Sequence, residues 1–134
     1  MATPFGNDAW VEELSEKLNT SKSYQQAAKK WEGDLTLIVE KEGSMPSDLY
    51  IYLDLWHGEC RSASSNTDPV SSEFTISGPL SVWKPVVDGK LDPIKALMGR
   101  KLKVQGNMMK IMKAPKAAIE LVNCAKSIET EWPN

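Results

Sequence analysis

Between Leu91 and Lys113 the chain carries start and end signals for three successive elements, and these restrict how the rest can be arranged. Asp92-Pro93 predicts a helix start, because aspartate caps free N–H groups and proline lacks the N–H that would be unsatisfied there. Residues 100–105 alternate between apolar and polar side chains, which is typical of a half-buried strand. Gly106-Asn107 then predicts a turn and the cap of a second helix, which contains Met108, Met109 and Met112.

Four further segments predict strands that precede this stretch, namely residues 35–40, 49–56, 59–63 and 73–77. The clearest is 49–56, where the aliphatic residues Leu49, Ile51, Leu53 and Leu55 share one face. We expect a turn at residues 32–34 and a polar loop at 64–69. Short connections favour antiparallel pairing, whereas the strand at 100–105 returns after helices and is expected to lie parallel to a neighbour.

Helical spacing of apolar residues occupies both ends of the chain and the region after Gly78-Pro79. Residues 7–24 predict two helices, or one helix broken near residues 19–21, and the same spacing continues to Trp31. Pro85 predicts a kink, and a last helix is expected over residues 116–129. We therefore expect an α+β fold: a five-stranded, mostly antiparallel sheet with helices covering one face. Residues 1–134 are expected to form a single domain, with a helical segment at about 7–31 and the sheet and helical layer at about 32–129.

Basic charge is concentrated in one part of a chain whose net charge is −2. Residues 93–119 contain seven basic residues and no acidic one, whereas residues 1–92 contain 8 basic and 15 acidic residues. Such a patch suits anionic lipid headgroups or a phosphate, and equally a solvated surface. It lacks interleaved aromatic residues, so we expect no nucleic-acid partner.

Catalytic and metal-binding patterns are absent from the sequence. The single histidine, His57, and the two cysteines, Cys60 and Cys124, do not make a zinc site, and we expect free buried thiols. Neither the phosphate-binding loops nor the Gly-x-Ser-x-Gly motif is present. Asp54 shares a strand face with Tyr50, Tyr52 and Trp56, which predicts a position on the outer face of the sheet, although an acid among aromatic residues could also serve as a polar anchor in a pocket. We expect no catalytic residues, no metal and no cofactor.

The sequence LMGRKLKVQGNM at residues 97–108, with Met112-Lys113 after it, resembles the sterol carrier protein 2 (SCP2) family. The pattern there is a short helix, a strand rich in Lys and Leu, and Gly-Asn-Met opening a helix with further methionines. A looser likeness in element order extends from about Trp31 to Ile128. The resemblance implies an apolar tunnel between sheet and helices that binds a fatty acid, fatty acyl-CoA or sterol-like lipid without catalysis.

Face assignment then gives candidate cavity residues from the sheet, the middle helices and the end of the chain. They are Leu53, Leu55, Trp83, Val86, Val87, Leu97, Met98, Met108, Met109, Met112 and Val122. Methionine is unbranched and adaptable, so it suits a cavity for a flexible chain, although it also serves as ordinary core filler. Candidates for contact with a headgroup or a membrane surface are Arg100, Lys110, Lys113 and Lys116.

Two other functional classes remain open. The apolar groove could bind a partner protein, and a homodimer would be one form of this. A lipid-modifying enzyme would need a polar cluster in the pocket, for which the sequence offers only Asp54, His57 and the tyrosines. The first residues lack a secretory signal pattern and the last three are not Ser-Lys-Leu, so cytoplasm is the expected location.

Overall fold

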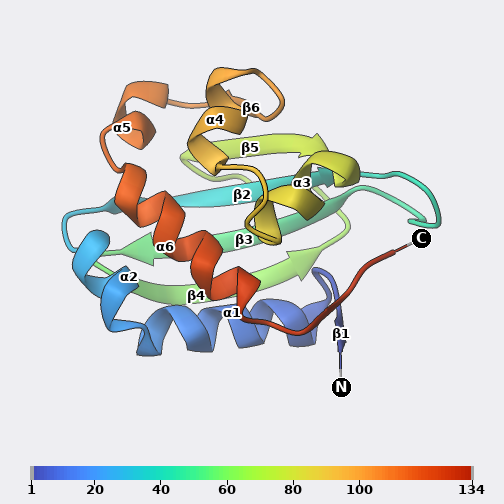
Figure 1. Ribbon diagram of the computed structural model, residues 1–134, viewed down its shortest axis with the longest axis horizontal. Coiled ribbons are helices and arrows are strands. Elements are labelled where there is room, and N and C mark those ends of the chain that lie inside the picture. The colour runs from blue at the N-terminus through green and yellow to red at the C-terminus, as the bar shows by residue number, and fades with distance from the viewer. Residues whose placement is uncertain (1, 134) are drawn as a thin grey trace.

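The computed structural model describes residues 2–133 and has the expected α+β architecture (Figure 1). Its main sheet contains β2 (Glu32–Glu40), β3 (Leu49–Trp56), β4 (Glu59–Asn66), β5 (Phe74–Pro79) and β6 (Lys103–Gln105), in the order β4-β3-β2-β5-β6. The helices are α1 (Asp8–Thr20), α2 (Lys22–Ala27), α3 (Leu80–Val87), α4 (Pro93–Met98), α5 (Met108–Met112) and α6 (Pro115–Lys126). The helical layer lies over one face of the sheet, with α6 crossing it (Figure 1).

The sheet is mostly antiparallel, as predicted, but its one parallel pair is not where the sequence suggested. β2 pairs antiparallel with β3, and β3 with β4, through short connections. The parallel pair is β2 with β5, whereas β6 is antiparallel to β5. The expectation of a parallel last strand was therefore wrong: the polar loop after β4 allows β5 to cross to the far side of β2, and β6 simply extends that edge.

Several predicted boundaries also need correction. Residues 32–34 belong to β2 and do not form a turn, and β4 continues through Asn66 into the segment predicted as a loop. The predicted strand at 100–105 is shorter, because Arg100 has a positive φ of 59° and delays the extended conformation until Lys103. The first helical segment breaks at Ser21, which caps α2, and helix ends at Ala27, before Trp31.

The termini form a second, two-stranded sheet that the sequence did not predict. β1 (Thr3–Pro4) pairs parallel with β7 (Thr130–Glu131). Phe5 stacks on Trp132 with ring centroids 4.4 Å apart, and the Trp10 indole N–H donates to the Thr130 hydroxyl at 3.0 Å. These contacts fasten both ends of the described chain to α1.

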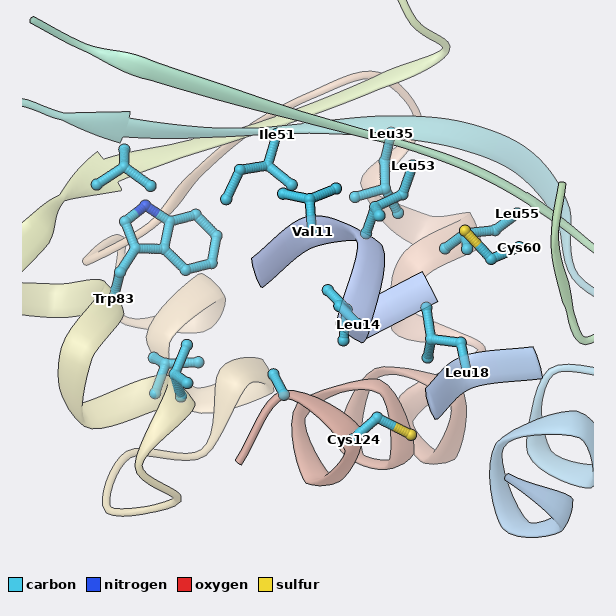
Figure 2. Packing of buried hydrophobic residues seen from close by; sticks show 14 of the residues in the cluster. Val11, Leu14, Leu18, Leu35, Ile51, Leu53, Leu55, Cys60, Trp83 and Cys124 are labelled. Atoms are coloured by element: carbon cyan, nitrogen blue, oxygen red, sulfur yellow. The ribbon is translucent and has the colours of Figure 1, made fainter. Parts of the chain in front are cut away.

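The core lies between the inner face of the sheet and α1, α3 and α6. Val11, Leu14 and Leu18 of α1 belong to the same buried cluster as the aliphatic residues of β3, and Val11 lies beside Ile51 (Figure 2). Side chains on this strand alternate between buried and more accessible positions, as its period of two requires. Within residues 2–133, no helix has both the length and the apolar character needed to cross a membrane.

Candidate functional site

An apolar cavity of about 110 Å³ lies between the sheet and its helical cover. Alternate residues of β2, together with residues of β3 and β5, form its sheet wall, and α3 to α6 form the opposite wall. The lining residues are Tyr24, Trp31, Leu35, Leu37, Leu55, Ile76, Trp83, Val86, Pro93, Leu97, Leu102, Ile111, Ala114, Ala117, Ala118, Leu121 and Val122. Among the described residues, none with a charged side chain contributes to this wall.

The polar atoms of the two lining tryptophans are bonded to the sheet itself. The Trp83 indole N–H donates to the carbonyl of Ile38 at 2.9 Å, and the Trp31 indole N–H donates to the carbonyl of Gly33 at 2.9 Å. Both acceptors belong to β2, so each ring is fixed in orientation. In the part of the chain that the structure describes, no buried side-chain nitrogen or oxygen lacks a partner. The cavity therefore offers an apolar wall and no unsatisfied group.

Tyr24 supplies the one ionisable side chain in the described wall and is kept neutral by its surroundings. It is only 1% exposed. Burial raises the pKa of its phenol well above the ordinary value, and the nearby Cys60 and Cys124 raise it further. Burial likewise raises the pKa of both cysteine thiols. The raised pKa values keep the phenol and both thiols protonated near neutral pH, and a protonated thiol is a poorer nucleophile than a thiolate.

Lys110 of α5 lies over the ring of Trp31, which is part of the cavity wall. Its ammonium donates to the carbonyl of Glu32 and to the Glu73 carboxylate, the latter at 3.0 Å. It also lies 5.3 Å from the centroid of the Trp31 ring, over its face. A lysine with these partners attaches α5 to the start of β2 and to Glu73, which directly precedes β5.

Several of the predicted cavity residues line this cavity. They are Leu55, Trp83, Val86, Leu97 and Val122. Leu53 and Val87 are buried in the surrounding core without lining it. The methionines lie elsewhere: Met98 and Met109 are 66% and 64% exposed, Met108 is 38% exposed, and Met112 is half-buried. In α4 and α5 the inward positions belong to Leu97 and Ile111 instead.

Met98 and Met108 border a second, outer hollow together with Arg100 and Lys103. Lys113 and Lys116 are exposed, as is Arg100. The predicted cationic residues are thus all at the surface, and Lys110 is half-buried by its contacts. The structure separates an inner apolar cavity from an outer surface that combines methionines and cations.

Sequence reasoning missed much of the wall, especially Tyr24, Leu35, Leu37 and the small residues of α6. The sequence did contain a signal for Leu35 and Leu37. They alternate on one face of β2, and their partners Leu53 and Ile51 lie on the same face of the sheet in β3. Ala114, Ala117 and Ala118 gave no such signal. The small side chain of an alanine leaves volume unfilled, and whether that volume becomes a cavity depends on how the neighbouring side chains pack.

Of the residues considered for catalysis, Tyr24 lines the cavity, whereas Asp54 and His57 lie away from it. Asp54 accepts from the Arg61 guanidinium at 3.0 Å on the outer side of the sheet. His57 contacts Glu32 at 2.5 Å at an exposed turn. Among residues 2–133 no cluster of histidine, cysteine and carboxylate side chains could hold a metal ion.

A mostly antiparallel sheet covered on one face by helices, with an apolar cavity between the layers, defines a class of α+β proteins. The model of the SCP-2 sterol transfer family matches residues 11–118. The chain therefore belongs to the SCP-2 sterol transfer family. A search of the curated proteins gives no significant match.

Solved structures agree with this assignment over nearly the whole chain. A crystal structure of sterol carrier protein 2 is 34% identical with a TM-score of 0.86, covering 92% of this chain and 98% of that one. A conserved protein of Thermus thermophilus, put forward as a sterol carrier protein, is 32% identical with a TM-score of 0.89, covering 98% and 94%. Sterol carrier protein 2 from Yarrowia lipolytica, in its apo form, shares the fold at 19% identity and a TM-score of 0.57, covering 87% and 88%.

Proposed function

We propose that this protein binds the hydrocarbon part of a lipid in the cavity between sheet and helices and carries it without chemical change. The observation that supports this most directly is the wall itself, whose lining is almost entirely apolar and, among the described residues, leaves no buried side-chain nitrogen or oxygen without a partner. Membership of a sterol transfer family supports the same ligand class. A fatty acid, fatty acyl-CoA or sterol-like lipid would satisfy these requirements.

Burial of hydrocarbon would supply the affinity. Each methylene removed from water contributes about 0.8 kcal/mol before the cost of association. A ligand that placed six methylenes inside would therefore gain roughly 5 kcal/mol from transfer alone. Because the described wall has no charged group, a polar head is expected to remain at the protein surface.

The cavity must enlarge to hold a long chain. Its volume of about 110 Å³ is smaller than the ~150 Å³ of an apolar cavity known to hold benzene. The sheet is fixed by its ladder of hydrogen bonds, whereas α4 and α5 have only six and five residues. We therefore expect α4 and α5 to move outward when a long-chain lipid enters.

Native mass spectrometry of protein purified without detergent, followed by organic extraction, tests the proposal. A lipid bound near one per chain would support it and identify the ligand class. A ligand-free mass, together with no binding of a fluorescent fatty acid, would contradict it.

A pair of alanine substitutions locates the ligand. Ala118→Leu adds three carbons to the cavity wall, whereas Ala9→Leu adds the same atoms to an exposed position on α1. We expect Ala118→Leu to weaken fatty-acid binding by roughly tenfold or more, since it displaces about two to three methylenes of ligand. Equal affinities of the two variants would place the ligand outside this cavity.

The alternative of a protein-interaction module gives different results in the same experiments. The protein would then co-purify with another chain or form a stable dimer, and Ala118→Leu would disrupt that assembly. A lipid-modifying enzyme has weaker support, because Asp54 and His57 are engaged with Arg61 and Glu32 outside the cavity.

A further inference from the structure

We infer that the surface formed by α4, β6 and the start of α5 docks on anionic lipid membranes, with Met98, Met108 and Met109 entering the interface and Arg100, Lys101 and Lys103 contacting headgroups. This membrane-docking face is defined by those six residues. Docking itself does not require a bound ligand. Its role in loading the cavity rests on the function proposed above.

Exposed methionines are the first observation. The large apolar side chains that are exposed in residues 2–133 are Trp56, Met98, Met108, Met109 and Ile119, so three of the five belong to this short stretch. Met98 and Met108 border the same outer hollow, although nine residues lie between them in the chain. Clustered exposed apolar side chains indicate a contact surface, and flexible methionines adapt to a disordered partner such as a bilayer.

Positive charge surrounds these methionines without compensation. Arg100 and Lys103 border the hollow with them, and Lys101 is exposed between those two residues. The chain contains no acidic residue from 93 to 119. Of the acids that flank or face this stretch, Asp92 caps α4, Glu73 accepts from Lys110, and Glu120 accepts from Asn123. A basic surface with apolar side chains at its centre matches the chemistry of an anionic membrane.

The opposite edge of the molecule carries the opposite charge. β6 forms one edge of the sheet and β4 the other, and α1 lies along β4 (Figure 1). The exposed face of α1 contains Asp8, Glu12 and Glu16. An anionic surface therefore repels the α1 edge and attracts the β6 edge, which orients the molecule as it approaches.

The docking face also adjoins the cavity directly. Leu97 and Leu102 line the inner cavity and also border the outer hollow. These two leucines therefore separate the proposed lipid site from the proposed membrane contact. Outward movement of α4 would open that partition toward the bilayer, so a lipid could pass without crossing water.

Sedimentation with unilamellar vesicles tests the inference on ligand-free protein. The vesicles contain phosphatidylcholine alone, or phosphatidylcholine with phosphatidylglycerol. Lys101→Gln/Lys103→Gln is compared with Lys29→Gln/Lys30→Gln, which removes the same charge at exposed positions after α2. Because the net charge of the protein is −2, binding to anionic vesicles must depend on a local patch.

We expect the wild type to bind the anionic vesicles and not the neutral ones, with binding weakened at high salt. Lys101→Gln/Lys103→Gln should lower the partition coefficient about tenfold or more, and Lys29→Gln/Lys30→Gln by less than about twofold. Met98→Gln/Met109→Gln should also weaken binding, since two largely exposed side chains can be changed without disturbing the core.

No binding by the wild type, or equal losses in the two lysine variants, would overturn the inference. A dimer that dissociates in Met98→Gln/Met109→Gln would also overturn it by assigning the face to a second copy of the chain. Fluorescent fatty-acid binding in solution is measured on the same variants and should be unchanged. If the wild type bound anionic vesicles but no fluorescent fatty acid, the proposed function would be contradicted and the docking inference would still hold.

Discussion

Gly106 occupies the position where the chain turns from β6 toward α5. Its φ is +116°, and a Cβ built on it would lie 2.8 Å from the carbonyl oxygen of Glu73 and 2.9 Å from Cδ1 of Phe74. The first of these atoms belongs to the backbone leading into β5, so it cannot move independently. Asn107 follows directly and caps α5 through its side chain. A single glycine thus sets how closely α5 approaches the sheet.

Substitution of Gly106 by alanine is expected to lower the free energy of unfolding by about 2–3 kcal/mol, from an unfavourable φ combined with the steric contact. Gly43→Ala is the matched control, because Gly43 also has a positive φ, of 57°, in an exposed loop. The control should cost only about 1 kcal/mol. Urea unfolding measures both values. An equal loss of stability in the two variants would show that the steric contact with Glu73 and Phe74 does not contribute to the effect of Gly106→Ala.

Burial of Tyr24 predicts a stability that falls at high pH. The pKa of its phenol is raised from 10.0 in the folded protein by burial, so the unfolded chain releases this proton first. The contribution of the neutral Tyr24 phenol to the free energy of unfolding is complete below about pH 10 and is lost as the pH rises toward the folded-state pKa. Urea unfolding measured from about pH 8 to pH 11 should show a shallower decline in Tyr24→Phe than in the wild type. Identical pH slopes would contradict this role of Tyr24.

At the scale of elements, α5 is the shortest helix in the described part of the chain. It has five residues, and only Ile111 among them is fully buried. The contacts of Lys110 with Glu32 and Glu73 supply most of its polar attachment to the sheet. Because Lys110 and Glu73 are 36% and 49% exposed, the ion pair is worth well under about 1 kcal/mol in water.

Lys110→Met removes this attachment while keeping an unbranched side chain over Trp31. We expect faster association of a fluorescent fatty acid in stopped-flow measurements, by a few-fold, because α5 detaches more readily. The free energy of unfolding should fall by less than about 1 kcal/mol. Lys113→Met, at an exposed position one turn later, is the control. An unchanged association rate in Lys110→Met would show that α5 does not limit entry.

The accuracy of sequence reasoning differed between elements for identifiable reasons. Asp92 and Asn107 marked the starts of α4 and α5 correctly, because capping depends on a few neighbouring residues. The direction of β6 was wrong, since pairing depends on where the chain crosses the sheet. The methionines were predicted to line the cavity from face assignment and the family resemblance, whereas Met98 and Met109 are largely exposed on their short helices. The alanines of α6 could not be predicted as lining residues, because the volume of a cavity depends on every element that surrounds it and not on the local sequence.

For the whole molecule, a bound lipid adds directly to the stability of the fold. A ligand present at about one hundred times its Kd contributes about 2.7 kcal/mol, provided that the unfolded chain does not bind it. For a domain of 134 residues this corresponds to a rise in Tm of roughly 8 °C. Differential scanning fluorimetry with a graded series of fatty acids should show this rise growing with chain length. A rise that is independent of chain length would indicate binding outside the cavity.

Two tryptophans in the cavity wall give this protein a built-in optical reporter. Trp31 and Trp83 are held in fixed orientation by hydrogen bonds to β2, and both line the same apolar cavity. An acyl chain bearing bromine atoms would lie against these indoles and quench their emission through close contact. Placing the bromine at successive carbons along the chain would reveal how deeply each carbon enters, so the direction of the ligand could be determined without labelling the protein.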